Sequence, residues 1–252
     1  MTAAPDLRIA PPAPSLRHRA WYGWALFWGA FFSVTMSPLL VLHSRFRPTS
    51  ETLRQWMRPW ARIVLALAGI RVEVVERGAH PEEPVVYVAN HVNSLDILAV
   101  MVGLPRPFLY VARHEIRDWP IVGWVLAETP CEFIQRDDPR QAVADLRRIT
   151  GRVEDGESVL LFPEGGRSHA HGMAPFMKGP FVLAIEAGVP IVPVTLVGHA
   201  GVFSKESKTA RPGRTRLVLG EAIATDGLSR RDANDLLART RAALEAELAA
   251  VA

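Results

Sequence analysis

The hydrophobic and polar positions divide the chain into two parts that meet near residue 70. Residues 20–44 contain no Asp, Glu, Lys or Arg and begin with a cluster of aromatic side chains: Trp21, Tyr22, Trp24 and Trp28. An uncharged run of this length is sufficient for a helix that crosses a bilayer, and aromatic side chains gather where helices meet lipid headgroups. We therefore predict a membrane-associated helical segment in the N-terminal part.

The way in which this segment meets the membrane stays open. A cleaved signal peptide fits poorly, because the apolar run is long for the hydrophobic region of a signal peptide and Pro38 lies inside it. Arginines lie on both sides of the run, Arg17 and Arg19 before it and Arg45 and Arg47 after it. The positive charges therefore favour no direction of crossing, and a membrane-spanning helix and a helical hairpin in one leaflet are both consistent with the pattern.

A second helix is predicted for residues 51–68. Its apolar side chains and its arginines fall on opposite helical faces: Trp56, Trp60, Ile63, Val64 and Leu67 against Arg54, Arg58 and Arg62. This distribution is typical of a helix that lies in the membrane interface, and the alternative is an amphipathic helix packed on the protein core. With the Pro-rich, basic residues at the N-terminus, the two helices make residues 1–69 a basic arm and a membrane-associated helical hairpin.

From residue 70 onward, short β-branched apolar runs alternate with helical periodicity. The expected strands are residues 71–75, 85–89, 108–112, 132–135, 159–162, 191–197 and 216–219. Helix starts are marked by Asp138 followed by Pro139 and by a capping box of Ser229 and Asp232. Strands interleaved with helices predict an α/β domain over residues 70–252, with a mixed, largely parallel sheet flanked by helices.

Composition narrows the class of protein without choosing a substrate. With 49% hydrophobic residues over 252 positions, the chain can bury a full core. The only cysteine, Cys131, excludes an internal disulfide framework and a multi-cysteine metal site. A net charge of +3 fits an anionic substrate or an anionic membrane surface. Nucleic acid is a poor partner, because the basic residues are dispersed and show no zinc-finger spacing.

The first candidate for chemistry follows the strand at residues 85–89. His91 falls on the turn after this strand, and Asp96 falls in the first turn of the next helix, which Asn93 or Ser94 can cap. A carboxylate bound to one imidazole nitrogen fixes the tautomer, so the other nitrogen can take a proton from a hydroxyl. The pair is therefore a candidate general base. The alternative is a loop histidine beside an aspartate that only favours the helix N-terminus.

The second candidate, Glu164-Gly165-Gly166-Arg167, follows the strand at residues 159–162. Two glycines let the backbone approach a ligand, and a guanidinium suits phosphate, although a tight turn with a solvated arginine has the same pattern. Ligands bind at the carboxyl ends of strands in open α/β sheets, so both candidates are expected at one edge. Neither the ending of a nucleotide P-loop nor a Gly-x-Ser-x-Gly elbow is present in the sequence.

Four blocks in this order resemble the glycerolipid acyltransferase family. They are Asn90-His91 with Asp96, Phe133-Ile134-Gln135-Arg136, the residues from Phe162 to Ser168, and the residues from Val189 to Val194. The resemblance covers roughly residues 55–220 and implies that His91 is the general base and Asp96 its orienting partner. It also implies that a set of residues holds the phosphate and glycerol of the acceptor, and that residues 189–194 shape the site. The implied substrate-binding residues are Arg113, Arg136, Glu164, Gly165, Gly166 and Arg167.

The resemblance implies a direct acyl transfer. The donor is acyl-CoA or acyl carrier protein, the acceptor is the free hydroxyl of 1-acyl-sn-glycerol-3-phosphate, and the product is phosphatidic acid for phospholipid biosynthesis. No cofactor and no metal are expected. The implied partners are a lysophospholipid, an acyl thioester and the bilayer, without nucleic acid. The expected location is the inner (cytoplasmic) membrane, with the active site on the cytoplasmic side.

Two departures from the family pattern leave the acceptor open. The second block follows Pro130-Cys131 where relatives begin with glycine, and Gly166 stands where relatives carry threonine, which removes one hydroxyl donor. A lyso-ornithine lipid or another lyso-lipid is therefore an alternative acceptor. A non-catalytic, membrane-bound lipid-binding protein is a further alternative. His169 and His171 have the spacing of a zinc-binding pair, but no third ligand follows at a recognisable spacing.

Overall fold

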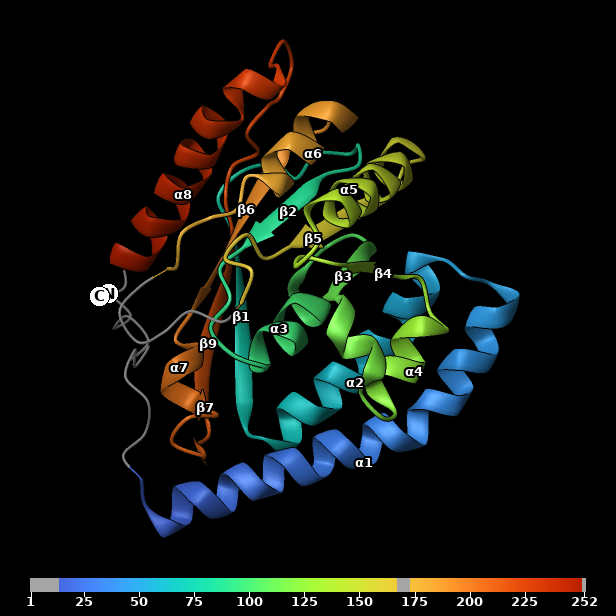
Figure 1. The fold of residues 1–252 in the computed structure, drawn as a ribbon. Helices are drawn as coiled ribbons and strands as arrows, with labels where there is room; N and C mark the ends of the chain where they lie inside the picture. Colours follow the sequence, from blue (N-terminus) through green and yellow to red (C-terminus); the bar gives the residue numbers. More distant parts are fainter. Residues whose placement is uncertain (1–13, 167–172, 251–252) are drawn as a thin grey trace.

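A seven-stranded sheet forms the centre of the molecule (Figure 1), in the order β1-β9-β6-β2-β5-β3-β4. The computed structural model describes residues 14–166 and 173–250. The strands are β1 Ile70–Glu76, β2 Val86–Ala89, β3 Phe108–Arg113, β4 Cys131–Ile134, β5 Ser158–Leu161, β6 Ile191–Val197 and β9 Gly213–Leu219. Strands β6, β2, β5, β3 and β4 run parallel, and β9 pairs antiparallel with β6 and parallel with β1. The predicted mixed, largely parallel sheet is confirmed, with every predicted strand present.

Helices cover both faces of this sheet, as Figure 1 shows. On one face α3 (Leu95–Gly103) and α2 (Ser50–Leu67) share a core with Tyr87 and Ala89 of β2. The opposite face carries α5 (Pro139–Glu154), α6 (Gly179–Ala187) and α8 (Ala233–Ala249). Alternate side chains of a strand point to opposite faces, so β2 is buried on both sides, as a central parallel strand requires.

Local capping agrees with the sequence signals at both predicted helix starts. The carboxylate of Asp138 accepts hydrogen bonds from the amides of Arg140 and Gln141 at the start of α5. The capping box of Ser229 and Asp232 opens the short helix η2 (Arg230–Asp232), which leads into α8. Caps of this kind satisfy amides that have no partner inside the helix, which is why short-range sequence patterns locate them well.

The N-terminal part consists of two helices that run in opposite directions, α1 (Leu16–Phe46) and α2. At one end Trp56 Nε1 donates to His43 Nδ1 over 2.9 Å, and at the other Trp24 Nε1 donates to the carbonyl of Leu67 over 2.9 Å. The buried face of α2 packs on the core through Leu53, Ala61, Val64 and Leu65, of which only Val64 belongs to the predicted apolar row. Helix α2 therefore corresponds to the alternative of an amphipathic helix packed on the core.

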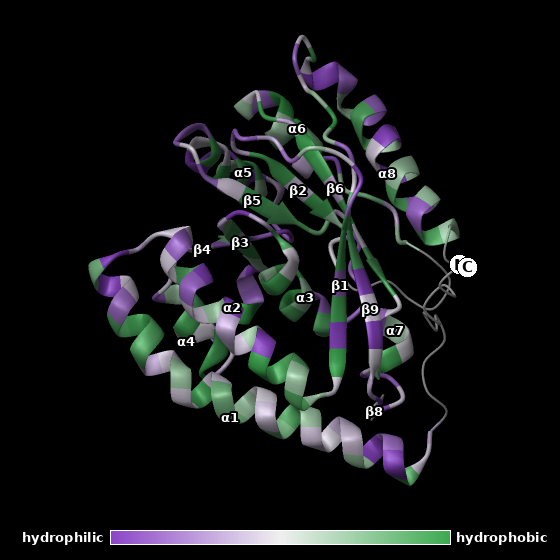
Figure 2. Cartoon of the chain, turned by 180° about the vertical axis from the view of Figure 1, so that it is seen from behind, coloured by the Kyte–Doolittle hydropathy of each residue, from purple (hydrophilic) through white to green (hydrophobic). Residues whose placement is uncertain are grey.

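Helix α1 lies outside α2 and exposes a long apolar face, which Figure 2 shows as mostly green and pale along its length. The exposed apolar side chains of α1 are Leu16, Trp24, Leu26, Phe27, Phe31, Val34, Leu39, Leu42 and Phe46. Within the described residues, α1 is the one helix long and apolar enough to cross a membrane, and only 22% of its most apolar window is buried. The length and composition of α1 are the features that make it a candidate membrane-spanning helix.

Shorter elements follow the strand ends. The sequence did not predict η1 (His114–Asp118) and α4 (Val122–Ala127) after β3, α7 (His199–Val202) after β6, or the small hairpin of β7 (Phe203–Ser204) and β8 (Thr209–Ala210). Between η1 and α4, Ile121 has φ 65° and ψ −60°, and Val122 N donates to the carbonyl of Pro120 over 2.7 Å. This is a γ-turn of the rare, strained type, and its central residue, Ile121, is β-branched.

Candidate active site

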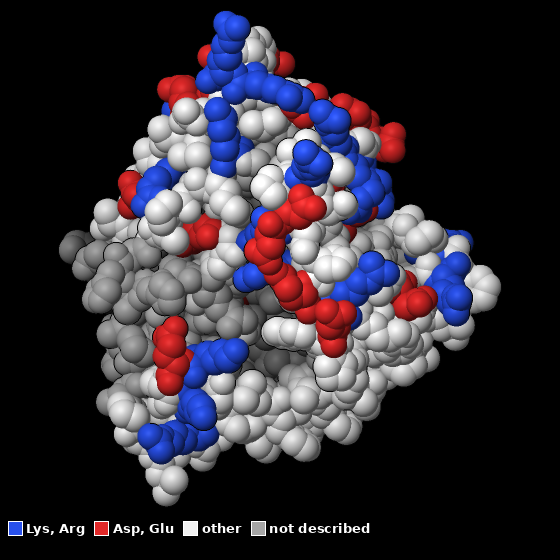
Figure 3. All heavy atoms as spheres, in the orientation of Figure 1, with Lys and Arg blue, Asp and Glu red and all other residues white. Residues whose placement is uncertain are grey.

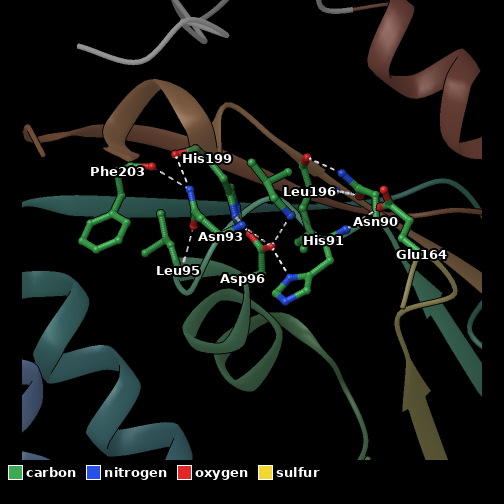
Figure 4. Close-up of polar contacts among 10 residues, drawn as sticks. Asn90, His91, Asn93, Leu95, Asp96, Glu164, Leu196, His199 and Phe203 are labelled. Atoms are coloured by element: carbon green, nitrogen blue, oxygen red, sulfur yellow. Dashed lines mark hydrogen bonds and ion pairs between the residues drawn. The ribbon is translucent and has the colours of Figure 1, made fainter. Parts of the chain in front are cut away.

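The candidate residues gather where neighbouring parallel strands end. His91 follows β2, Glu164 and Gly165 follow β5, Arg113 ends β3 and Arg136 follows β4. The two candidate stretches are in direct contact, because the amide of His91 donates to Oε1 of Glu164 over 2.9 Å. Figure 4 shows this contact and the network around Asp96. The prediction that both stretches lie at the same edge of the sheet is therefore confirmed.

His91 and Asp96 form a hydrogen-bonded pair, with Nδ1 of His91 2.8 Å from Oδ2 of Asp96 (Figure 4). The same oxygen accepts from the amides of Val92, over 2.5 Å, and Asn93, over 2.8 Å. Because a carboxylate only accepts, the hydrogen of His91 lies on Nδ1 and the lone pair on Nε2. The geometry is that of an oriented general base.

Asp96 is fully buried at the start of α3. Burial raises the pKa of its carboxyl, but hydrogen bonds from His199 and His91, together with their charges, outweigh burial and hold the pKa below its ordinary value. The carboxylate therefore stays ionised beside His91.

The His91 ring is held on its other side by Phe162, the residue after β5. The two rings stack with centroids 4.3 Å apart and planes inclined by 27°. The side chain of His91 keeps 16% of its surface exposed, whereas that of Asp96 has none. The imidazole is thus fixed in orientation and still accessible from outside the protein.

Two asparagines connect the turn that carries His91 to β6 and to the segment after it. The Asn90 amide exchanges two hydrogen bonds with the backbone of Leu196, over 3.1 and 2.7 Å. Asn93 donates from Nδ2 to the carbonyls of His199 and Phe203 and accepts at Oδ1 from the amide of Leu95. Ser94 holds the N-cap position of α3 without a side-chain hydrogen bond, so Asn93 alone performs the predicted capping role.

His199, which sequence analysis missed, completes the network. Its Nδ1 lies 2.5 Å from Oδ1 of Asp96, and the residue is 1% exposed. The sequence contained a usable signal, because Gly198-His199 directly follows the strand predicted at residues 191–197 and so falls at the same sheet edge. No sequence-spacing rule connects His199 to Asp96, because 103 residues separate them.

Glu164 binds backbone on both sides of the site. Oε1 accepts from the amide of His91, and Oε2 accepts from the amide of Ala174 over 2.7 Å. The side chain therefore fixes the turn that presents His91. Its expected role toward the glycerol of the acceptor stays a prediction.

The glycines differ in how closely they are packed. Gly165 has φ +71°, a conformation that favours glycine, and a Cβ there would also make the ends of the Arg136 and Met177 side chains shift, since it would lie 2.9 Å from Nη1 and 3.0 Å from Cε. At Gly166 a Cβ would meet nothing within 4 Å, and the residue is exposed. Arg167, like His169 and His171, lies outside the described residues, and its expected phosphate contact stays a prediction.

Arg136 and Arg113 bring positive charge to the site. Arg136 is half-buried and donates from Nη1 to the carbonyl of Gly165, while its buried Nε has no partner among the described residues. Burial lowers the pKa of Arg136, and the nearby charge of Arg113 lowers it further. Arg113 itself pairs with Glu115 over 2.9 Å. Two guanidinium groups at close range favour an anionic ligand.

The described residues contain no cluster of three or more His, Cys, Asp or Glu side chains suited to a metal ion. The residues that the structure brings together are His91, Asp96, His199, Glu164, Gly165 and Arg136. This set can orient an imidazole as a base and connect it through adjoining turns to a half-buried cation. The arrangement suits removal of a proton from a neutral hydroxyl on an anionic molecule.

Comparisons with known proteins agree with this interpretation. Residues 71–197 match the family model described as Acyltransferase. The 1-acyl-sn-glycerol-3-phosphate acyltransferase alpha of Ovis aries is 31% identical over 237 residues, which is 92% of this chain and 79% of that protein. A 1-acyl-sn-glycerol-3-phosphate acyltransferase of Chlamydomonas reinhardtii is 40% identical over 145 residues, which is 57% of this chain. The match spans less than half of the algal relative, 43% of its length.

The fold has a counterpart among solved structures. The crystal structure of the 1-acyl-sn-glycerophosphate (LPA) acyltransferase PlsC from Thermotoga maritima superposes with a TM-score of 0.71. The superposition covers 93% of this chain and 98% of that one, at 22% sequence identity. The arrangement of sheet and helices, including an N-terminal helical part, is therefore shared over nearly the whole length of both chains.

Proposed function

The chain belongs to the acyltransferase family, and from this membership we propose that it moves a fatty acyl group from an acyl thioester to the free hydroxyl of 1-acyl-sn-glycerol-3-phosphate, giving phosphatidic acid. The observation that carries the proposal is the oriented pair of His91 and Asp96, joined through Glu164 and Gly165 to the guanidinium of Arg136. A base for the hydroxyl and a cation for the phosphate thus lie on adjoining turns. The relatives named for this reaction add independent support.

In the proposed reaction Nε2 of His91 takes the proton of the acceptor hydroxyl while the oxygen attacks the thioester carbonyl. The thiol then leaves with the proton returned by His91, so the protein forms no covalent acyl intermediate and needs no cofactor. Asp96 stabilises the imidazolium that forms in between, because its buried carboxylate already accepts from Nδ1. Base catalysis of this kind contributes about 10²–10⁴-fold.

Arg136 is the residue best placed to bind the acceptor phosphate. Its guanidinium is half-buried and carries a permanent positive charge, which favours a bound anion such as phosphate. Burial and the nearby charge of Arg113 both lower the pKa of Arg136, and a bound anion would offset both effects. We assign the phosphate to this pair, with Arg167 as a third contact expected from the sequence.

The glycine at position 166 supports a second candidate acceptor. Gly166 is exposed and offers no hydroxyl, so its side chain neither binds a phosphate nor blocks a larger headgroup. A lyso-ornithine lipid, which carries a carboxylate and an ammonium, is the specific alternative. It keeps an anionic group for Arg136 and differs in the cation that it adds.

We propose that α1 anchors the protein at the cytoplasmic side of the inner membrane. The apolar face of α1 is exposed along its whole length, and the uncharged residues 20–44 make up most of the helix. An acceptor and a product that are both lipids make an anchored site useful, since the lyso-lipid reaches the site without leaving the leaflet.

The test is a transfer assay with purified protein in mixed detergent micelles. The acceptors are 1-acyl-sn-glycerol-3-phosphate, a lysophosphatidylcholine and a lyso-ornithine lipid, each with acyl-CoA or acyl carrier protein as donor. Free thiol and the acylated lipid are measured together, the latter by mass spectrometry. We expect phosphatidic acid as the main product and acceptor-dependent thiol release.

Three results would contradict parts of the proposal. Preferred acylation of the lyso-ornithine lipid would transfer the assignment to the second acceptor. Thiol release that does not depend on any acceptor would indicate a thioesterase. Lipid binding without thiol release, in protein shown to be folded by circular dichroism, would support a non-catalytic lipid-binding protein.

A further inference from the structure

We propose that His199 is a positioning residue for the reaction, which holds the carboxylate of Asp96 so that Asp96 can orient His91. The proposal rests on the proposed acyl transfer. It starts from one contact, the 2.5 Å hydrogen bond between Nδ1 of His199 and Oδ1 of Asp96. The carboxylate of Asp96 thus lies between two imidazoles, of which only one belongs to the block that relatives share.

The two oxygens of Asp96 have separate partners. Oδ2 accepts from Nδ1 of His91 and from the amides of Val92 and Asn93. Oδ1 accepts from His199, which is its hydrogen-bond partner within the part of the chain that the structure describes. Without His199, a fully buried carboxylate oxygen would lose its donor. A buried charged oxygen without a donor is costly, so the carboxylate would rotate or take up a proton.

The chemistry of the contact fixes the tautomer of His199. A carboxylate accepts and does not donate, so the hydrogen lies on Nδ1. Nε2 is buried and has no partner in the described residues, and the side chain has no exposed surface. His199 therefore cannot reach a substrate, and any effect on the reaction passes through Asp96.

The backbone of His199 is fixed to the same turn as its side chain. Gly198 has φ +80°, which turns the chain sharply from β6 into α7, and the carbonyl of His199 accepts from Nδ2 of Asn93. Asn93 lies between His91 and Asp96 in the sequence. His199 is thus held from both ends against the turn that it supports, as a positioning role requires.

The charge of Asp96 also depends on this contact. The hydrogen bond from His199 is the largest of the effects that lower the pKa of Asp96 against the opposing effect of burial. Removing the imidazole leaves burial less opposed and raises that pKa. Loss of His199 should therefore reduce kcat, because His91 loses part of its orientation and its counter-charge, while neither substrate loses a contact.

The experiment compares His199→Phe, which keeps the ring volume and removes the donor, with His199→Asn, whose Nδ2 can occupy the position of Nδ1. We expect His199→Phe to lower kcat by about 10–100-fold per folded molecule, with KM values for acceptor and donor within about twofold of the parent. His199→Asn should recover most of the loss. His80→Phe is the matched control. His80 lies in the loop that precedes β2, at the opposite end of this strand from His91, so the same exchange there should leave kcat unchanged.

A readout that needs no substrate separates this inference from the proposed function. Proton NMR of protein with ¹⁵N-labelled histidine should show two strongly downfield Nδ1–H signals, one for each imidazole on Asp96. His199→Phe should remove one signal and shift the other, and His91→Ala should remove the second. A parent protein with both signals and no transfer would contradict the proposed function alone. Unchanged kcat in folded His199→Phe, or an unshifted His91 signal, would overturn the role of His199.

Discussion

Two regions depart from the usual distribution of polar side chains outside and apolar side chains inside, and they do so in opposite ways. One is the edge of the sheet that carries His91 and Asp96 (the catalytic edge), and the other is the outer face of α1. The catalytic edge buries polar groups, among them Asp96, His199, Asn90 and Asn93, and gives each of them hydrogen bonds within the protein. Helix α1 exposes large apolar side chains such as Phe27 at 59% and Leu42 at 56%. The first region finds most of its hydrogen-bond partners within the protein, and the second leaves its apolar surface uncovered by the described residues.

The two regions match two separate requirements of an enzyme that acts on lipids, a fixed catalytic base and access to the lipid. A base that works at a fixed place needs polar groups whose positions are set before the substrate arrives. The lipid substrates of the proposed reaction also require contact with a leaflet, and exposed apolar surface of the kind found on α1 is suited to it. In Figure 3 the band along α1 is mostly uncharged, whereas charged side chains cover the upper part of the same face.

The largest effect is expected at the catalytic edge. His91→Ala should lower kcat by about 10²–10⁴-fold, because it removes the proton acceptor while the fold and vesicle binding persist. The measurement is thiol release at saturating acceptor and donor, with sedimentation on vesicles in parallel. His80→Ala is the control, since it removes an imidazole at the opposite end of β2 from His91. Near-parental turnover in folded His91→Ala protein would end the assignment of the base.

A smaller effect is expected for the cation of the same edge. Arg136→Ala should raise the KM for the anionic acceptor by roughly 10–100-fold, since one charge-assisted contact contributes about 1.5–3 kcal/mol. The KM for the donor should change much less. Arg136→Lys keeps the charge but lacks the planar fork and should recover part of the affinity. An increase confined to the donor KM would reverse the assigned roles.

For the other region we expect an effect on membrane binding and none on chemistry. Phe27→Ser removes an exposed aromatic ring of α1 and should weaken partition onto anionic vesicles on the order of tenfold, since burial of such a side chain contributes about 1.5–3 kcal/mol. Turnover in detergent should stay at the parental level. Val143→Ser is the control, because Val143 is as exposed, at 51%, but lies on α5 across the sheet. Equal loss of binding in both variants would remove α1 as the anchor.

The smallest effect concerns the turn that links the two regions. Ile121 holds a strained γ-turn ahead of α4, and α4 contacts α1. Ile121→Gly should stabilise the fold by up to about 1 kcal/mol, because glycine accepts this backbone conformation and the relief exceeds its extra entropy in the unfolded chain. The urea midpoint at constant slope measures the change. A lower midpoint would mean that packing of the isoleucine outweighs its strain.

Much of the fold was predictable from the sequence because its signals are local. The apolar runs located every strand of the large sheet, and Asp138 and Ser229 located helix starts through contacts within three residues. The pair of His91 and Asp96 was predictable for the same reason. The short elements α4 and α7 and the β7–β8 hairpin were not predicted, since each spans too few residues for a periodic pattern.

What the sequence could not reveal depends on contacts between distant segments. The contact of His199 with Asp96, and the hydrogen bonds of Asn90 and Asn93 to distant backbone groups, depend on the register that places β6 beside β2. For α2 the sequence predicted Val64 on the apolar face but not the buried Ala61, because only the packing of α2 against the sheet and α3 shows which side of the helix is covered. The sequence pointed to Gly165, but neither its positive φ nor its contact with Arg136 could be predicted.

The hydrogen bonds that join the His91 turn to β6 and to the segment after it span 103 to 110 residues. A chain is synthesised from its N-terminus, so α1 emerges from the ribosome long before Leu196, His199 and Phe203. While β6 is still missing, Asp96 lacks the donor from His199, and Asn90 and Asn93 lack the backbone groups that they bind. A nascent or truncated chain that stops short of β6 therefore already carries the proposed membrane anchor, while the turn of its proposed base is not yet held in place.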